Sequence, residues 1–137
     1  MTTPADTSVM QLELVPVPVG DVDRARVFYE EQLGFHVDHD VRPAEGVRVV
    51  QLTPRGSACS IVLSTGLPGL GGMTVGSLRG LHLVVANVER TRAELLARGV
   101  DVGEIDDAGR GVRYAAFRDP DGNSWVLQEL AWRSPGP

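Results

Sequence analysis

The sequence predicts an α+β fold in which one β-α-β-β-β unit occurs twice. Short segments rich in β-branched residues surround one amphipathic helical segment, and the same order of segments returns about 65 residues later. A glycine-rich linker at 66–78, whose composition suits a flexible crossover, separates the two copies. Because 137 residues is the usual size of one domain, both units are expected to share a single domain over 1–137.

The first unit is expected at about 11–65, and local sequence features place its elements. The segment LELVPVPV at 12–19 favours an edge or bulged strand, because its two prolines remove ladder donors. Asp21 is placed to cap a helix whose apolar residues recur at helical spacing, and Gly34 is placed for its left-handed stop. Three segments with strand character follow at 35–41, 46–53 and 58–65.

The second unit, at about 79–130, repeats four sequence blocks of the first unit in the same order. DVDRAR at 21–26 matches NVERTR at 87–92 at an offset of 66, LGF at 33–35 matches RGV at 98–100 at 65, GVRV at 46–49 matches GVRY at 111–114 at 65, and SIVL at 60–63 matches SWVL at 124–127 at 64. Any two amphipathic units can share one short match by coincidence. Four matches in one order favour duplication.

Composition argues against several partners and locations. The formal net charge is −5 and the arginines are scattered, so the electrostatic attraction that drives nucleic-acid binding is missing. No apolar run approaches the ~20 residues that cross a bilayer, so no membrane partner is expected. The N-terminal segment has no signal-peptide pattern, and the single cysteine, Cys59, cannot form an internal disulfide. We therefore expect a cytoplasmic protein.

Two longer motifs carry a resemblance to a known family. VGDVDRARVFYEEQLGF at 19–35 and DPDGNSWVLQE at 119–129 are similar to the helix start and the final hairpin of the vicinal oxygen chelate superfamily. This superfamily includes glyoxalases, bleomycin-resistance proteins and extradiol dioxygenases, and the resemblance covers Leu12 to Leu130. It implies curved mixed sheets that enclose one cleft, with a helix on the outer face of each sheet. It says less about function, because one fold supports many chemistries.

The resemblance also implies where a metal would bind. Enzymes of the superfamily hold their metal at one position near the start of the first strand and one on the last strand of each unit. In this sequence those positions are Leu14, Val62, Gly80 and Val126, whose side chains offer no lone pair to a cation. A catalytic site needs about three ligands from histidine, carboxylate or thiolate groups. We therefore predict that the protein holds no metal and needs no other cofactor.

His82 is the candidate catalytic residue. Side chains at i and i+2 of a strand share a face, so His82 is expected to point into the same cleft as Gly80. Its role stays open among hydrogen bonding or proton transfer, a structural role, and metal binding through a two-residue shift. For a shifted metal site, Ser64 and Gln128 are the nearest polar partners, and they are poor ligands. We favour hydrogen bonding or proton transfer.

The alternation of side chains along a strand predicts further pocket residues around His82. If Val126 faces the cleft, the residues two positions away on either side face it too. A tight turn at 119–122 would place Phe117 and Arg113 beside them, although the arginines could instead be solvated. The complete predicted ligand-binding set is Leu14, Arg48, Ser60, Val62, Ser64, Gly80, His82, Arg113, Phe117, Ser124, Val126 and Gln128.

Apolar walls with scattered polar groups predict a pocket for a small organic molecule. We therefore expect a metal-free binding protein of the glyoxalase/bleomycin-resistance type that holds an apolar or aromatic ligand. The alternatives are a lyase or isomerase with His82 as general acid/base, and a metal-dependent glyoxalase or dioxygenase with displaced ligands. A homodimer is expected, because each short open sheet leaves edges that would otherwise template aggregation.

Overall fold

Two four-stranded mixed sheets make up most of the structure, a computed structural model that describes residues 8–133. The first sheet has the order β1-β4-β3-β2, with β1 Leu14–Pro16, β2 His36–Ala44, β3 Val47–Thr53 and β4 Ser60–Thr65. The second has the order β5-β8-β7-β6, with β5 Leu81–Val84, β6 Asp106–Gly109, β7 Val112–Arg118 and β8 Ser124–Leu130. The predicted α+β fold with tandem units is confirmed, and the two sheets do not close into a barrel.

The duplication extends to the hydrogen-bonding register of the two sheets. In each sheet the first strand runs parallel to the last one, and the remaining pairs are antiparallel. Val15 pairs with Ile61 in the first sheet, and Leu81 pairs with Trp125 in the second. Val15 and Leu81 are 66 positions apart in the sequence, and Ile61 and Trp125 are 64 positions apart. The sequence blocks of the two units are related by the same offsets. Equivalent positions in the two units can therefore be compared residue by residue.

Each unit contributes one helix that begins at a side-chain cap. α1 (Val22–Val27) follows Asp21 and α2 (Val88–Ala97) follows Asn87, and each cap accepts a hydrogen bond from the backbone N–H three residues later, at 3.1 and 2.9 Å. α1 continues as a π-helical turn, η1 (Phe28–Gln32). Gly34 follows with φ +78°, the left-handed conformation expected there. No helix within residues 8–133 is long and apolar enough to span a membrane.

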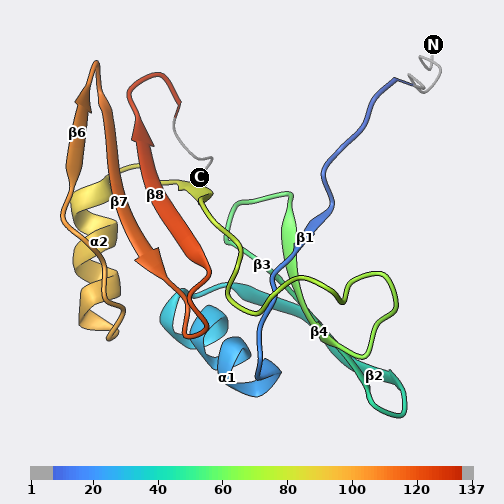
Figure 1. Ribbon diagram of the computed structural model, residues 1–137. Helices are drawn as coiled ribbons and strands as arrows, with labels where there is room; N and C mark the ends of the chain where they lie inside the picture. The colour runs from blue at the N-terminus through green and yellow to red at the C-terminus, as the bar shows by residue number, and fades with distance from the viewer. Residues whose placement is uncertain (1–7, 134–137) are drawn as a thin grey trace.

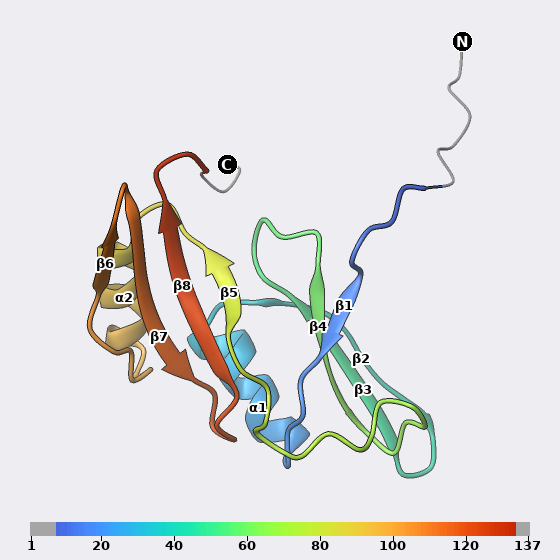
Figure 2. The same cartoon turned by 45° about the horizontal axis from the view of Figure 1, so that its top comes forward.

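One hydrophobic core joins the two units, because α1 packs on both sheets. Figures 1 and 2 show α1 below the gap between the sheets and α2 behind the second sheet. Phe28 and Tyr29 of α1/η1 contact Phe117 and Trp125 of the second sheet, with ring centroids 6.4 and 5.7 Å apart. Aromatic pairs of this kind bury large areas and favour tilted arrangements. The side of each sheet that faces the helices is therefore closed to ligands.

Buried hydrogen bonds hold the turn between β7 and β8. The carboxylate of Asp119 accepts hydrogen bonds from the Tyr29 hydroxyl at 2.7 Å and the Asn123 amide at 2.8 Å. Trp125 donates from its indole N–H to the same Tyr29 hydroxyl at 2.9 Å. Burial, and then the charge of Asp119, raises the pKa of Tyr29, which keeps the hydroxyl protonated as a donor. The DPDGN segment thus ties the second sheet to η1. We call Tyr29, Asp119, Asn123 and Trp125 the turn network.

Candidate ligand-binding site

The predicted site residues of the second sheet lie mainly on the face turned away from the helices. The alternate residues of β5, β7 and β8 pack in the core, so their neighbours must point the other way. We call this surface the open face, and its residues are Gly80, His82, Val84, Tyr114, Ala116, Arg118, Ser124, Val126 and Gln128. It combines small or apolar side chains with a few hydrogen-bonding groups, which is typical of a binding surface for an organic molecule.

The corresponding face of the first sheet is partly covered by the linker. Leu14, Ser60, Val62 and Ser64 lie on this face by the β1–β4 and β3–β4 pairing. Leu70, Met73 and Val75 of the linker line the same small hollow as Val62 and Ser64, and Val62 is only 3% exposed. The hydroxyl of Ser60 is also occupied, because it lies 2.7 Å from the hydroxyl of Thr53. In this chain the second sheet therefore presents the larger accessible face.

A groove of about 230 Å³ lies where the two sheets meet, and both units line it. We call it the seam groove, and its lining residues are Leu12, Val15, Pro54, Ser57, Cys59, Ser60, Ile61, Leu81, His82, Leu83 and Trp125. Pockets that enclose drug-sized ligands usually measure ~300–1,000 Å³, so the seam groove holds only part of such a molecule. His82 belongs both to the seam groove and to the open face. A larger ligand would therefore run from the groove across His82 onto the open face.

His82 is exposed, and its contacts define which ring nitrogen faces a ligand. It pairs with Val126 across β5 and β8, and its Nδ1 lies 2.6 Å from the carbonyl oxygen of Gly80. A carbonyl oxygen only accepts, so this contact requires the hydrogen on Nδ1 and leaves Nε2 of the neutral ring as an acceptor. The ring of Tyr114 stands edge-on to the imidazole with centroids 6.3 Å apart. His82 can therefore accept a hydrogen bond, or a proton, from a bound molecule.

Phe117 and Arg113 do not lie on the open face, which corrects the predicted register of β7. Val126 pairs with Ala116, one residue from the expected partner. The reason is that Asn123 belongs to the turn, since the Asp119 N–H donates to its carbonyl at 2.9 Å, so the turn is one residue longer than predicted. A one-residue shift exchanges the two faces of a strand. Phe117 is consequently 3% exposed and stacks on Trp125 in the core.

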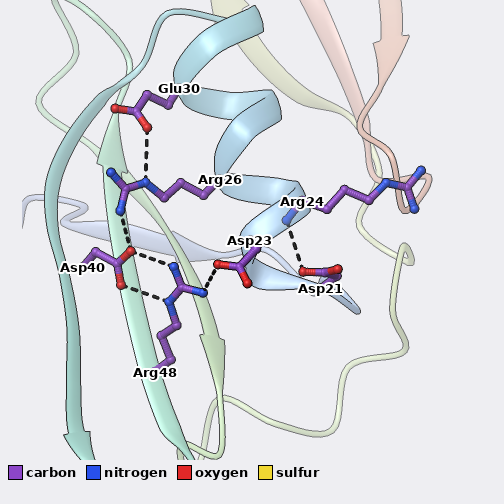
Figure 3. A network of polar contacts seen from close by, with 7 residues as sticks. All are labelled: Asp21, Asp23, Arg24, Arg26, Glu30, Asp40 and Arg48. Atoms are coloured by element: carbon purple, nitrogen blue, oxygen red, sulfur yellow. Dashed lines mark hydrogen bonds and ion pairs between the residues drawn. The ribbon is translucent and has the colours of Figure 1, made fainter.

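Arg48 also lies on the helix side, where it holds the start of α1. It donates hydrogen bonds to both carboxylate oxygens of Asp40 at 3.0 and 2.7 Å and pairs with Asp23, as Figure 3 shows. Arg113 pairs with Glu89 at the start of α2 in the same way. These hydrogen bonds raise the pKa of both guanidinium groups, so both stay charged. The two arginines that were expected in the pocket are thus structural, and neither can reach an open-face ligand.

The duplicated sequence carries a feature that would have revealed this pairing. The second helical residue is acidic in both blocks, Asp23 in DVDRAR and Glu89 in NVERTR, 66 residues apart. Each of these residues meets the arginine of the GVR segment in its own unit. The open-face residues that sequence reasoning missed are Val84, Tyr114, Ala116 and Arg118. Tyr114, Ala116 and Arg118 of β7 become visible once Asn123 is counted as part of the turn, and Val84 follows from His82 by strand alternation.

Replacing Asp40 with asparagine should lower the free energy of unfolding by about 1–2 kcal/mol at pH 7. Hydrogen bonds from Arg48 and then Arg26 lower the pKa of Asp40 to about 2 from 3.8, although burial opposes the shift. A lowered pKa in the folded state stabilises the protein above pH ~4, and this contribution disappears as the pH falls toward 2. Urea unfolding of both proteins should therefore show a difference at pH 7 that shrinks below pH ~4.

The matched control for this experiment is Asp106→Asn, which changes an exposed carboxylate on β6, in the other sheet from Arg48. This control should change the free energy of unfolding by less than about 0.5 kcal/mol at either pH. A difference between wild type and Asp40→Asn that stays constant from pH 7 to pH 2 would contradict the assigned ion pair.

The open face offers no set of metal ligands. No group of three or more His, Cys, Asp or Glu side chains that could hold a metal ion occurs within residues 8–133. The positions that the family resemblance implies, Leu14, Val62, Gly80 and Val126, carry no donor atoms in their side chains. His82 has a free ring nitrogen, but metal binding needs further ligands around it. The residues present therefore do not fit a catalytic metal.

Solved structures with this fold include proteins of similar sequence. The chain is 35% identical to TnmS3, an antibiotic binding protein from Streptomyces sp. CB03234, over 92% of this chain and 100% of that one, with a TM-score of 0.77. A glyoxalase/bleomycin resistance protein from the same organism is 38% identical over 85% and 98%, with a TM-score of 0.72. A superfamily member from Sphaerobacter thermophilus DSM 20745 is 28% identical over 88% and 98%, with a TM-score of 0.73.

No curated protein matches the chain. The family model of the glyoxalase/bleomycin resistance protein/dioxygenase superfamily matches residues 11–127. This range includes both sheets almost entirely, both helices, the seam groove and nearly all of the open face. By fold, by tandem units and by sequence, the chain belongs to the glyoxalase/bleomycin resistance protein/dioxygenase superfamily.

Proposed function

We propose that this protein binds a small organic molecule with an apolar or aromatic body and that it does so without a metal. The observation that carries the proposal is the composition of the continuous surface formed by the seam groove and the open face. Apolar side chains such as Leu81, Val84 and Val126 provide most of it, and His82 and Gln128 provide isolated hydrogen-bonding groups. This combination suits an organic ligand that is oriented by few polar contacts. The similarity to an antibiotic binding protein supports the same conclusion.

The neutral aromatic probe N-phenyl-1-naphthylamine tests the proposal directly. Its fluorescence should rise saturably with added protein, because the probe leaves water for the apolar surface. Val126→Glu should abolish this binding, since the ligand would have to cover an unpaired carboxylate at the centre of the open face. The control is Val41→Glu on β2, where the wild-type valine is already 45% exposed and outside the seam groove. Equal loss in both variants would contradict binding at the open face.

Metal independence is tested by chelation and by elemental analysis. Protein purified without chelator should contain far less than one equivalent of zinc, nickel, iron or manganese per chain, because the four implied ligand positions lack donor atoms. Treatment with EDTA should leave the affinity for N-phenyl-1-naphthylamine unchanged. Near one metal per chain, or loss of probe binding after EDTA, would contradict the proposal.

A second candidate function rests on the free Nε2 of His82. As a general base this atom would take a proton from a bound ligand, the first step of a lyase or isomerase reaction. We rank this function below binding, because the polar contact of His82 is with the Gly80 carbonyl and no acid is paired with its ring among residues 8–133. A metal-dependent reaction ranks lower still, since no ligand cluster occurs within the described residues.

We also propose that the protein acts in the cytoplasm and has no nucleic-acid or membrane partner. The support is the net charge of −5 and the unpaired, half-buried Cys59.

The protein is expected to form a homodimer in solution. β2 and β6 are unpaired edges of their sheets, and the segment before β1 extends away from the sheets in Figures 1 and 2. This segment exposes apolar side chains, with Met10 90% and Leu12 70% exposed. Light scattering should therefore give about twice the chain mass of 14.7 kDa, and Met10→Asp combined with Leu12→Asp should weaken the dimer. A monomer mass at micromolar concentration would contradict this expectation.

A further inference from the structure

Arg118 and Ser124 are neighbours on the open face, and both have hydrogen-bond donors that a ligand could use. They pair directly across β7 and β8, so their Cβ atoms are roughly 5 Å apart. The Oγ of Ser124 accepts a hydrogen bond from the Gly80 N–H at 2.8 Å, which leaves the serine O–H free to donate. The guanidinium of Arg118 makes no hydrogen bond or ion pair with any residue that the structure describes.

Arg118 differs from Arg48 and Arg113, the two arginines that occupy equivalent positions in the two sheets. Arg48 and Arg113 lie on the helix side, and each is held by an acidic residue of a helix start. Arg118 follows Arg113 in the same strand by an odd number of residues, so it points to the opposite face. It is therefore the cation that a molecule on the open face would meet.

A hollow of about 490 Å³ lies beside Arg118, and small residues make room in it. Its lining residues are Asp101, Gly103, Ala116, Phe117, Arg118 and Ser124, and within residues 8–133 Asp101 makes no ion pair with Arg118. Ala116 pairs with Val126, so an apolar surface continues toward His82. With strands ~4.8 Å apart and ~3.3 Å per residue, the path from Arg118 to His82 measures on the order of 12 Å. This length suits two or three aromatic rings.

We propose that Arg118 and Ser124 form an anion-binding end of the ligand site and that the ligand is an organic anion. Its carboxylate, sulfonate or phenolate oxygen accepts hydrogen bonds from the guanidinium and the serine hydroxyl. Its apolar body covers Ala116 and Val126 and ends near Nε2 of His82. Asp101 opposes this selection, because it is an acidic residue that lines the same hollow. The inference rests on the proposed function, since it assigns a charge preference to the same surface.

Two probes with one aromatic body separate charge from apolar contact. The probe 1-anilinonaphthalene-8-sulfonate carries a sulfonate, and N-phenyl-1-naphthylamine is the same molecule without it. In fluorescence titrations, Arg118→Gln should weaken binding of the sulfonate probe about ten-fold and change the affinity for the neutral probe less than about two-fold. Asp101→Asn should act in the opposite direction and strengthen binding of the sulfonate probe only.

Two further variants make the result specific to Arg118. Arg42→Gln removes the same charge from an exposed position on β2 and should alter neither affinity. Arg118→Lys keeps the charge and should retain most of the preference for the sulfonate probe. The sulfonate affinity of the wild type should also fall with added salt more steeply than that of Arg118→Gln.

Each outcome of the titrations decides the proposal. A selective loss of sulfonate binding in Arg118→Gln supports it. Equal weakening of both probes, or no change in either, overturns the anion-binding end while the proposed function stands. If the wild type binds neither probe, the proposed function itself fails, and the assignment of Arg118 fails with it.

Discussion

Replacing Asn123 with alanine should lower the free energy of unfolding by about 3–5 kcal/mol. Asn123 is 0% exposed, and its amide makes three hydrogen bonds with the rest of the protein. It donates to Asp119 at 2.8 Å and to the Pro18 carbonyl at 2.9 Å, and it accepts from the Leu78 N–H at 3.0 Å. Alanine would remove the partner of the Leu78 N–H and of the Pro18 carbonyl and one of the donors to the Asp119 carboxylate, which keeps the Tyr29 hydroxyl. Each buried polar group that loses its partner costs about 1–3 kcal/mol. Urea unfolding followed by tryptophan fluorescence measures the loss.

Asn87→Ala is the matched control, because Asn87 is also an asparagine that bonds a backbone N–H but is exposed at the start of α2. Loss of an exposed cap typically costs about 1 kcal/mol. Asn123→Asp sharpens the test, since it keeps the shape, loses both donors and places a second carboxylate beside Asp119. This variant should be destabilised more at pH 7 than at pH 4, where carboxylates begin to protonate. Equal losses for Asn123→Ala and Asn87→Ala would contradict the turn network.

The same residue explains why the sequence predicted most of the fold but only part of the site. Duplication, the order of elements and the two helix starts follow from local patterns, which repeat at fixed offsets. The register of β7 depends on the length of one turn, and that length depends on the hydrogen bonds of Asn123 to Pro18, which precedes α1, and to Leu78 at the end of the linker. These contacts join residues as far apart as Pro18 and Asn123, 105 positions along the chain. A local pattern cannot contain them, so Phe117 and Arg113 were assigned to the wrong face.

Arg48 was misplaced for a related reason. Strand alternation puts it in line with Val50 and Leu52, which are buried, but a charged residue is rarely placed inside without a partner. Its partners Asp23 and Asp40 come from two other elements that fold over it. The expectation for His82 was more robust, because it depends only on the alternation within β5 and on the parallel pairing with β8.

The linker is another segment whose tertiary contacts could not be predicted from its local sequence. Its glycines suggested a flexible connection, yet its apolar residues Leu70, Met73 and Val75 lie over the first sheet at Val62. The glycine content indicated how freely the backbone of the linker can bend, but it did not indicate that the linker would pack on the first sheet. As a result the two units, though equivalent in register, offer a ligand different surfaces. The first unit contributes mainly the rim of the seam groove, and the second contributes the open face.

Replacing His82 with alanine should weaken binding of 1-naphthol about five- to ten-fold and change the melting temperature little. The hydroxyl of 1-naphthol can donate to Nε2 of His82, the ring nitrogen that the Gly80 contact leaves free. The methyl ether, 1-methoxynaphthalene, has the same rings without the donor, so its affinity should be nearly equal for wild type and variant. Fluorescence titration with the two naphthalenes measures both affinities.

Leu81→Ala is the matched comparison, since Leu81 precedes His82 in β5 and points to the opposite face. Leu81 packs against the core and pairs with Trp125, so its truncation should cost about 2 kcal/mol, the lower end for a large-to-small change at a partly buried site. Leu81 also lines the seam groove, so both naphthalenes should bind this variant somewhat less well, and by equal factors. The decisive quantity is the ratio of the 1-naphthol affinity to the methyl ether affinity. A ratio that falls for Leu81→Ala as much as for His82→Ala would show that the imidazole does not receive the ligand's hydrogen bond.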